Sequence, residues 1–377
     1  MHPLDRKLLR DLWRLRLQAL AVALIVASGV AVLVMSLAAI EALEDTAGRY
    51  YERQRFADVF ASARRAPEAV AREIAALRGV RIAESRIRRF ATLDVGDFPE
   101  PVMASLVSVP EGGQPVLNRL VLRAGRWIQP GRPDEVLVNE SFAEGHGLTP
   151  GERFHALVNG RRRELVVVGV ALSPEFVYAI GPGALMPDAK RYGAVWMGRE
   201  ALEAAYDLEG AFDDLVLTLH RGARSEDVIE RIDALLDPWG GTGAYPRRDQ
   251  LSNWFLMNEI EQLRAMAQIL PTIFLLVAAF LTNMVLARLI AIERSEIGLL
   301  KAFGYSDFAV GLHYAKLVVV LASLGVGIGW IAGDLFGRWT TAIYADFFRF
   351  PLLVYAPGAG VFLLSGAVSL GAALAGA

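Results

Sequence analysis

Cysteine is absent from the 377 residues of the chain. No disulfide can stabilise any part of it, and neither thiolate chemistry nor a cysteine-based metal site is available. A surplus of charge of one sign is lacking too, because 39 Lys and Arg stand against 41 Asp and Glu, which gives a formal net charge of -2. The cations are spread along the chain rather than gathered in runs. The sequence therefore gives no indication of nucleic-acid binding.

Motifs for nucleotide binding and catalysis are missing as well. The sequence contains neither G-x-x-x-x-G-K-[ST], which would bind ATP through a P-loop, nor H-E-x-x-H or G-x-S-x-G. Its five histidines are scattered. The glycine-rich residues 240–243 follow a predicted helix rather than a strand, so we interpret them as a loop and not as a phosphate cradle. We accordingly expect no catalytic residues, no metal site and no cofactor in this chain.

Long apolar runs dominate what the sequence does contain. Hydrophobic residues make up 54% of the chain, and four runs extend over residues 17–41, 269–292, 309–337 and 351–377. The second run is preceded by a predicted stalk, so that stalk and second span together occupy residues 259–292. Each run is longer than the roughly 20 residues that cross a hydrocarbon core about 30 Å thick. The sequence therefore predicts an α-helical membrane protein with four transmembrane helices.

The cations beside these runs predict the orientation in the membrane. Residues 1–16 interleave five cations with leucine and tryptophan, which is typical of an amphipathic helix on the inner membrane surface. The turn 293–308 carries Arg294 and Lys301, so the positive-inside rule places it, like the N-terminus, in the cytoplasm. A signal peptide cleaved near Ala38 is the alternative for the first run, but the length of that run favours a membrane anchor.

Residues 42–258 are polar and rich in turns, as expected for a globular domain outside the membrane. The two ends of this domain, 42–115 and 210–258, each read as strand, helix and strand, and we interpret them as two βαβ units of one α/β lobe. Between them, residues 116–209 are predicted to form a mainly β inserted lobe, in which Asn159-Gly160 is the strongest hairpin signal. We thus predict an α+β domain outside the membrane.

An apolar segment within the inserted lobe has two interpretations. It contains Phe176, Val177 and Tyr178 in a stretch punctuated by proline and glycine. These side chains can be buried against the β lobe, because loops also cover apolar residues of their own. The alternative is a contact surface for an apolar substrate or partner, since large exposed apolar patches usually mark such sites.

Two features of the apolar runs suggest mechanical parts. Residues 250–292 read as one helix of about 40 residues, which is twice the thickness of the membrane, so we expect a stalk outside the bilayer. In the third run four glycines recur at every fourth position and form a stripe that permits close helix packing. They are Gly325, Gly329, Gly333 and Gly337. The sequence leaves open whether the helix that packs on this stripe belongs to this chain. After the third run, residues 338–350 are predicted to form an outer loop.

The charged turn after the second run carries a dense motif. It reads Glu293-Arg294-Ser295-Glu296-Ile297-Gly298-Leu299-Leu300-Lys301-Ala302-Phe303-Gly304. This order resembles the E-R-x-x-E-I-G-x-L-[KR]-A-x-G loop of the FtsX/MacB family of ABC-transporter permeases. The matching residues are Glu293, Arg294, Glu296, Ile297, Gly298, Leu300, Lys301, Ala302 and Gly304. A second block, which extends from Gly125 to Glu152, resembles the periplasmic lobe of the same family.

The resemblance implies a permease subunit that is not itself an enzyme. In that family the loop is a coupling helix that docks on a separate ABC ATPase dimer, and the permease works by mechanotransmission. ATP hydrolysis then moves the coupling helix, and the periplasmic domain handles an amphiphile such as a lipid, lipoprotein or peptide. The resemblance also implies a multi-pass protein of the bacterial inner membrane, in contact with membrane lipid and with a second permease half or subunit.

Alternatives remain within the same family. FtsX-like members regulate cell-wall hydrolases through a periplasmic partner protein, and a sensor module without transport would use the same parts. The fourth run ends the chain without the cytoplasmic cations that the predicted topology calls for. We therefore also expect a truncated product, the first half of a double-length permease.

Overall fold

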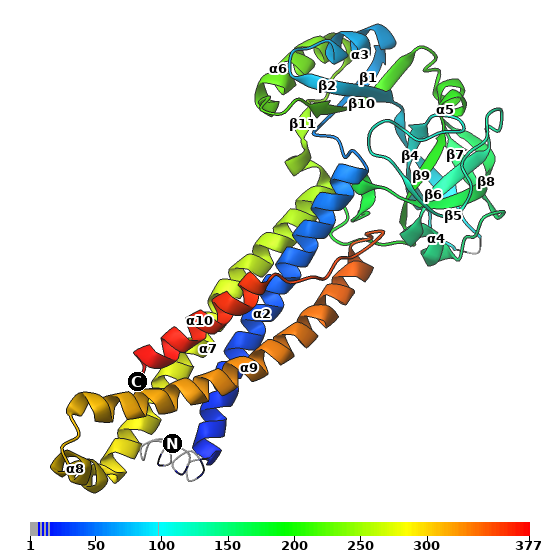
Figure 1. The fold of residues 1–377 in the computed structure, drawn as a ribbon. Coiled ribbons are helices and arrows are strands. Elements are labelled where there is room, and N and C mark those ends of the chain that lie inside the picture. The colour runs from blue at the N-terminus through cyan, green and yellow to red at the C-terminus, as the bar shows by residue number, and fades with distance from the viewer. Residues whose placement is uncertain (1–6, 8–9, 11–12, 14–15, 97) are drawn as a thin grey trace. The chain divides into compact units, whose positions relative to one another are not determined.

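A computed structural model describes residues 7, 10, 13, 16–96 and 98–377 (Figure 1). The amphipathic helix predicted for residues 1–16 lies largely outside these residues. The chain divides into two compact units. The helical unit comprises Met1–Asp45, Glu259–Tyr344 and Leu353–Ala377, and the α+β unit comprises Thr46–Asn258 and Ala345–Leu352.

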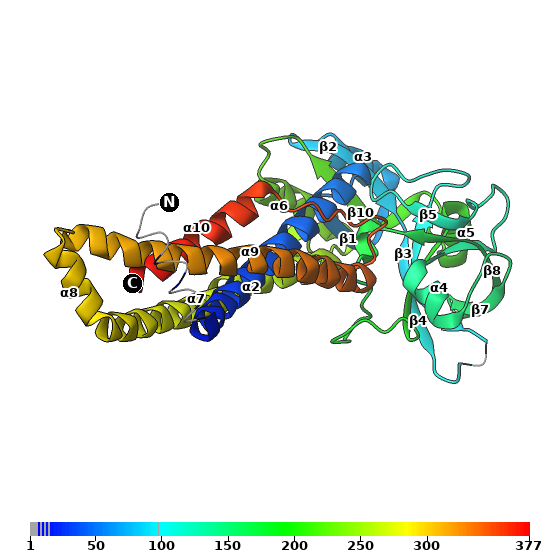
Figure 2. The ribbon, with the colours of Figure 1, turned by 60° about the horizontal axis from the view of Figure 1, so that its bottom comes forward.

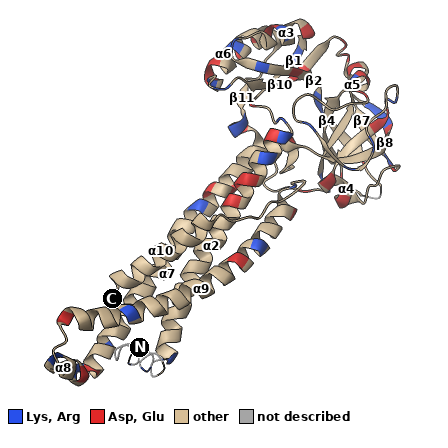
Figure 3. Cartoon of the chain, viewed as in Figure 1, with Lys and Arg blue, Asp and Glu red and all other residues tan. Residues whose placement is uncertain are grey.

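Among the residues that the structure describes, five helices contribute to the helical unit. They are α2 (Arg16–Arg53), α7 (Leu251–Ile292), α8 (Arg294–Ala302), α9 (Asp307–Phe347) and α10 (Ala359–Ala375). Among the described residues, α2, α7 and α9 are long and apolar enough to cross a membrane, whereas α10 has 17 residues. Figure 2 shows these helices from a second side, and Figure 3 shows that charged residues are scarce in their middle parts. Three spans are therefore supported by length, and the fourth stays a prediction.

The first two long helices extend beyond the apolar runs. α7 is a single helix of 42 residues, as the sequence predicts, and contains Pro271. α2 continues to Arg53, twelve residues past the predicted end of the first span. This extension contains no proline, and Glu44 forms an ion pair with Arg264 of α7. Charged residues therefore mark the end of the apolar run without ending the helix.

α9 ends later than predicted. Residues 338–347, expected in an outer loop, continue the helix to Phe347. This stretch contains neither glycine nor proline, so nothing in it breaks a helix. In addition, the hydroxyl of Tyr344 donates a hydrogen bond to Glu259 of α7 at 2.7 Å. The prediction of a loop at 338–350 is therefore wrong, and residues 348–358 form the connection to α10 instead.

The first sheet of the α+β unit has four strands. They are β1 (Val59–Pro67), β2 (Val80–Arg86), β10 (Ala211–Leu219) and β11 (Tyr245–Pro246), in the order β11-β1-β10-β2 with antiparallel neighbours. Helices α3 (Glu68–Ala75) and α6 (Ser225–Leu236) follow β1 and β10. Ile74 of α3 and Ile232 of α6 are buried in one core with Leu217 of β10. The strands of β1-α3-β2 lie on either side of β10, and the strands of β10-α6-β11 lie on either side of β1. This is a split βαβ arrangement.

The second sheet of the α+β unit has seven strands in the order β5-β8-β6-β9-β4-β3-β7, and β7 also pairs with β8, which closes the sheet. The strands are β3 (Arg88–Asp94), β4 (Val102–Val109), β5 (Val121–Gly125), β6 (Glu135–Asn139), β7 (Arg153–Val158), β8 (Arg161–Leu172) and β9 (Tyr192–Gly198), with helices α4 (Glu140–His146) and α5 (Arg199–Tyr206) between them in the chain. Asn159 and Gly160 have φ of 47° and 76° between β7 and β8, which confirms the predicted hairpin.

The second sheet corrects one predicted boundary. β3 pairs with β7, and β4 pairs in parallel with β9. The inserted lobe therefore begins at Arg88 and not at residue 116. Strand pairing between segments far apart in the chain decides this boundary, and the local sequence around 88–115 contains no sign of it.

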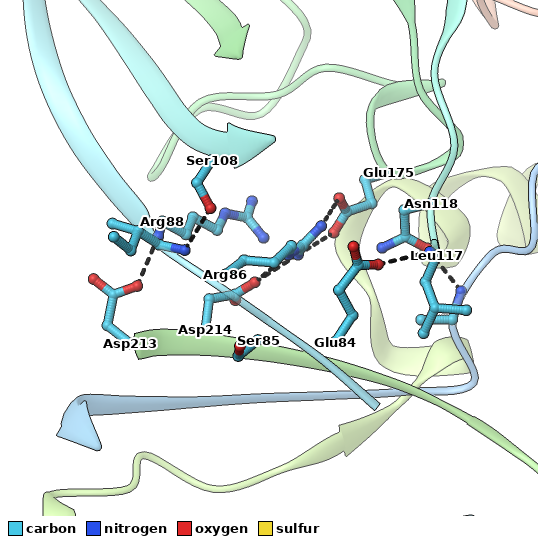
Figure 4. A network of polar contacts seen from close by, with 12 residues as sticks. Glu84, Ser85, Arg86, Arg88, Ser108, Leu117, Asn118, Glu175, Asp213 and Asp214 are labelled. Carbon is cyan, nitrogen blue, oxygen red and sulfur yellow. Dashed lines mark hydrogen bonds and ion pairs between the residues drawn. The ribbon is translucent and has the colours of Figure 1, made fainter. Parts of the chain in front are cut away.

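A buried ionic cluster lies where β2 ends and β3 begins. The guanidinium of Arg86 donates to both carboxylate oxygens of Glu175 at 2.7 and 2.9 Å and to Asp214 at 2.7 Å (Figure 4). All three side chains are buried. Burial alone would raise the pKa of Glu175, but the charge and hydrogen bonds of Arg86, together with the charge of Arg88, outweigh this and hold that pKa below its usual value. The cluster therefore connects three segments that are distant in the sequence.

Asp213, which directly precedes Asp214 of this cluster, should make the stability of the protein depend on pH. Its carboxylate accepts a hydrogen bond from the backbone N–H of Arg88 at 2.6 Å and lies 2.6 Å from Nε of Arg89. Burial nevertheless raises the pKa of Asp213 from 3.8 to about 6. The folded protein thus binds this proton more tightly than the unfolded chain does. The free energy of unfolding should therefore fall as pH rises from about 4 to about 6, by up to about 3 kcal/mol.

Replacing Asp213 with asparagine should remove this contribution, because the amide keeps an acceptor for the N–H of Arg88 but does not ionise. Thermal unfolding of the purified full-length protein and of Asp213→Asn between pH 4 and 7 measures it. We expect the variant to gain stability relative to the natural protein as pH rises through about 6. Two parallel curves would contradict the assignment.

Candidate functional site

α8 is a short helix held between two long apolar helices. α7 ends at Ile292, and α8 begins after Glu293, whose backbone leaves the helical conformation. At the other end Gly304 has φ of 91°, a left-handed conformation that glycine adopts without steric cost. The hydroxyl of Ser306 then accepts a hydrogen bond from the backbone N–H of Ala309 at 3.2 Å and caps α9. Gly304 therefore marks the end of α8, and Ser306 marks the start of α9.

Large apolar side chains project from this turn. Leu299 is 61% exposed, Phe303 76% and Phe308 80%. Leu299 and Phe303 are four residues apart, which is close to one helical turn, so they lie on one face of α8. The motif in residues 293–304 did not single out these side chains, because two of them occupy its variable positions. Their spacing in a charged turn is the signal that could have identified them.

The side chain of Glu293, the first residue of the motif, lies inside the turn. Its side chain is buried, and its carboxylate lies 2.7 Å from Nζ of Lys7 and accepts a hydrogen bond from the hydroxyl of Tyr314 at 2.9 Å. Lys7 also lies 3.0 Å from the carboxylate of Glu296. Because a buried carboxylate needs such partners, Glu293 supports the turn from within. The resemblance assigns Glu293 to the coupling motif, and the structure buries its side chain within the turn.

The other residues of the motif differ in exposure. Those with exposed side chains or backbone are Arg294, Glu296, Gly298, Lys301, Ala302 and Gly304, whereas Ile297 and Leu300 are half-buried. Lys301 forms an ion pair with Asp307 at the start of α9. A Cβ added at Gly298 would meet nothing within 4 Å, so its small size is not required by contacts within the described part of the chain. The exposed surface of the turn thus combines apolar side chains with two cations, Arg294 and Lys301.

The glycine stripe of α9 faces α2 of the same chain. A Cβ built on Gly325, Gly329 or Gly333 would lie within 2.9 Å of valine side chains of α2, and a Cβ on Gly337 would meet the hydroxyl of Tyr355 instead. The valines are Val26, Val30 and Val34. The sequence left open which helix packs on the glycine stripe. For three of the four glycines that helix is α2 of the same chain.

The apolar segment around Phe176 is not an exposed surface. Phe176, Val177 and Tyr178 are all buried within the α+β unit. The ring of Phe176 packs edge to face on Trp196 with centroids 5.9 Å apart, and the ring of Tyr178 lies 4.6 Å from that of Phe255. The prediction of an exposed contact for a substrate or partner at these three residues is corrected to a role in the core. Loops bury apolar residues by folding over them, and composition does not distinguish the two cases.

Metal binding finds no support in the part of the chain that the structure describes, because no group of three or more His, Asp or Glu residues there could hold an ion. The arrangement around α8 instead offers a docking surface. It is a short helix with an apolar face, displayed between two helices that are each long enough to span a membrane.

These features define a membrane protein with a displayed helical turn, and a comparison with known families specifies the class. Residues 269–377 match the family model described as FtsX-like permease C-terminal. This part of the chain is therefore an FtsX-like permease domain, which confirms the resemblance inferred from the motif in residues 293–304. Permeases of this ABC-transporter type are not themselves enzymes and work with ABC ATPase partners.

Two solved structures resemble the chain over about half of its length. One is the extracellular domain of the noncanonic ABC-type transporter YknZ from Gram-positive bacteria, with 12% identity, 50% of this chain and 98% of that chain covered, and a TM-score of 0.33. The other is the periplasmic region of MacB from Actinobacillus actinomycetemcomitans, with 12% identity, 55% and 94% covered, and a TM-score of 0.33. No curated protein matches the chain.

Proposed function

We propose that this chain is a permease subunit that couples ATP hydrolysis on a separate ABC ATPase dimer to the handling of an amphiphilic substrate outside the bacterial inner membrane. α8 is the coupling helix, and the subunit works by mechanotransmission along its long helices. The observation that carries this proposal is the exposed apolar face of α8, with Leu299 and Phe303, on a turn between two membrane-length helices.

The energetics of docking support α8 as the contact with the ATPase. Burying a leucine or phenylalanine side chain stabilises a complex by about 1.5–3 kcal/mol. Aromatic anchors that fill a pocket usually dominate the binding energy of such interfaces. Arg294 and Lys301 beside the apolar face add charge that can match carboxylates at the rim of a partner groove. A short rigid helix bearing all of these groups is suited to transmit a movement of the partner.

The remaining parts of the proposal follow from the same topology. Cations near α8 favour a cytoplasmic location for this turn, which places the α+β unit outside the membrane. α10 then crosses the membrane as a fourth span, because 17 residues is the lower limit for such a helix. A second permease half or subunit completes the transporter, and the α+β unit handles a lipid, lipoprotein or peptide, with or without a periplasmic partner protein.

Truncating the apolar face of α8 should abolish ATPase binding. We expect Leu299→Ala and Phe303→Ala each to weaken binding roughly tenfold or more, since each removes most of one buried side chain. The tagged chain would be purified from the cells that naturally contain it. Recovery of an ABC ATPase, identified by mass spectrometry, and ATP hydrolysis by the complex are the two readouts.

Ile331→Ala is the matched control for these variants. Ile331 is 68% exposed on α9, so the change removes a comparable apolar side chain away from α8. It should leave the recovered ATPase unchanged. Equal recovery from all of the variants and from the natural chain would refute the docking role of α8, whereas equal loss from all of them would show that exposed apolar residues matter irrespective of position.

A further inference from the structure

A cavity in the α+β unit lies on one face of the four-stranded sheet. It has a volume of about 490 Å³ and is lined by the last turns of α2, by β2 and β10, and by Leu117. Ile82 of β2 and Thr218 of β10 are cross-strand neighbours and both line it. Side chains alternate between the faces of a strand, so Thr218 points away from Leu217, which packs with α6. The cavity therefore occupies the face of the sheet that the helices α3 and α6 leave free.

The apolar wall of this cavity is rigidly packed. Tyr51, Phe56 and Leu117 are each at most 7% exposed, and the rings of Tyr51 and Phe56 lie 4.6 Å apart. Arg247 lies over the ring of Phe56 and donates hydrogen bonds to the carbonyl oxygens of Phe56 and Ala57. These contacts hold the wall in place, so the cavity is a preformed feature of the fold. Its volume falls within the range of pockets that bind small molecules, about 300–1,000 Å³.

Two buried hydroxyl groups belong to residues of the same cavity. Among the described residues, neither Oη of Tyr51 nor Oγ1 of Thr218 has a hydrogen-bond partner. Buried polar groups are nearly always paired, and leaving one unpaired is unfavourable. Both atoms are shielded from solvent, so they lie behind the surface of the cavity and not on it.

The charges at the cavity specify the sign of such a ligand. Arg55 and Arg81 line it with exposed guanidinium groups, and no ion pair of the described residues involves either of them. Arg247 also lines the cavity but pairs with Asp58. Glu52 is the one carboxylate among the lining residues. The excess of guanidinium groups favours an anion, and guanidinium groups bind carboxylate and phosphate in a geometry that allows two hydrogen bonds.

We propose that this cavity binds the anionic headgroup of an amphiphile, a carboxylate or phosphate, together with the adjoining part of its apolar chain. Arg55 and Arg81 neutralise the headgroup, and the chain lies against Phe56 and Leu117. The inference rests on the proposed function in one respect, that the substrate is an amphiphile. It adds the sign of the headgroup and a binding site in the α+β unit.

Octyl phosphate is the probe that tests this site. Its binding to the full-length protein in lipid nanodiscs would be measured by calorimetry, with inorganic phosphate and octyltrimethylammonium as comparison ligands. We expect octyl phosphate to bind at least roughly tenfold more tightly than inorganic phosphate, which lacks the apolar chain. Octyltrimethylammonium should not bind. Equal binding of inorganic phosphate, or binding of the cationic amphiphile, would overturn the proposal.

Substitutions at the cavity separate binding from structure. Arg81→Gln should weaken octyl phosphate binding roughly tenfold, because it removes a charge-assisted hydrogen bond. Arg72→Gln, which changes an exposed arginine of α3 that does not line the cavity, is the matched control and should bind normally. Arg55→Gln should weaken binding in the same way, because Arg55 is the other exposed guanidinium at the cavity.

The two proposals about this chain have separate readouts, because octyl phosphate binding is measured with no ATPase present. A chain that recovers no ATPase but binds octyl phosphate retains the cavity site and loses the coupling function. A chain that recovers the ATPase but does not bind octyl phosphate overturns the cavity site alone. Unchanged octyl phosphate binding by both Arg81→Gln and Arg55→Gln would also overturn it, since the ligand would then lie elsewhere.

Discussion

Replacing Gly329 with leucine should prevent stable packing of the helical unit, whereas the same change at Gly327 should be tolerated. A Cβ added at Gly329 would lie 2.5 Å from Cβ of Val30 and 2.8 Å from the carbonyl oxygen of Ala27. Neither atom can move without moving the backbone of α2. A Cβ added at Gly327, two residues away on α9, would meet nothing within 4 Å.

The cost of the change at Gly329 arises from lost contact along the whole stripe. To admit a larger side chain, α9 must move away from α2, and the close approaches at Gly325 and Gly333 are then lost as well. Helix packing in lipid depends on such van der Waals contact, because lipid tails are as apolar as the side chains they would replace. Overpacking a core usually costs about 1–3 kcal/mol, and we expect Gly329→Leu to reach or exceed that range.

Detergent-solubilised protein from the natural chain and from both variants would be heated and then analysed by size-exclusion chromatography, which reports the fraction that remains folded. The melting temperature of Gly329→Leu should fall clearly below that of Gly327→Leu. Val326 is not a suitable control despite its position beside the stripe, because its side chain is buried. Equal melting temperatures for the two glycine variants would mean that the stripe is not a packing surface.

The glycine stripe also shows how far local sequence pattern can predict this fold. Spacing of four residues predicted a helix surface for close packing, and the same spacing recurs in its partner at Val26, Val30 and Val34. That second pattern was available in the sequence, but three valines in an apolar run are common and do not indicate their partner by themselves. The C-terminal end of α8 at Gly304 and the start of α9 at Ser306 follow from local sequence, because caps depend only on neighbouring residues.

Features that depend on distant residues could not be predicted in this way. The sequence assigned residues 88–115 to the wrong lobe, because the strands that pair with them lie some 50 to 100 residues further along the chain. It left Phe176 as either buried or exposed, since an apolar loop has the same composition in both cases. The partners of Glu293 are likewise distant, as Lys7 lies 286 residues before it. Composition and period predict the elements, but long-range packing decides which of their side chains remain exposed.

The ionic cluster at Arg86 is another assembly of residues that are distant in the sequence, and it leads to the second large expected effect. Arg86→Met should destabilise the protein by about 3–5 kcal/mol, the usual consequence of removing one partner from a buried ion pair. Methionine fills similar space. It leaves the carboxylates of Glu175 and Asp214 buried, however, without the guanidinium from which both accept hydrogen bonds in the natural protein. The unpaired charges, and not a cavity, are then the cause of the loss.

Arg191→Met is the matched control for this variant. Arg191 also pairs with two carboxylates, Glu100 at 2.6 Å and Asp188 at 2.7 Å, but all three side chains are more than a third exposed. Water and salt screen such exposed pairs, so their loss should have little effect. The comparison therefore changes burial while keeping the residue type and the number of partners.

The pH dependence of Arg86→Met distinguishes a charge effect from a packing effect. Without Arg86, burial raises the pKa of Glu175, so this carboxylate binds a proton more tightly in the folded variant than in its unfolded chain. The stability of the variant should then recover as pH falls toward that raised pKa, whereas the natural protein, with the pKa of Glu175 held low, shows no such gain from this group. Glu175→Gln added to Arg86→Met should restore part of the lost stability at neutral pH, because it removes one buried charge. Both effects are measured by thermal unfolding at pH 5 and pH 7.5 of the natural protein, Arg86→Met, Arg191→Met and the double variant Arg86→Met with Glu175→Gln. A loss of stability that is independent of pH and is not relieved by Glu175→Gln would show that Arg86 contributes through packing alone.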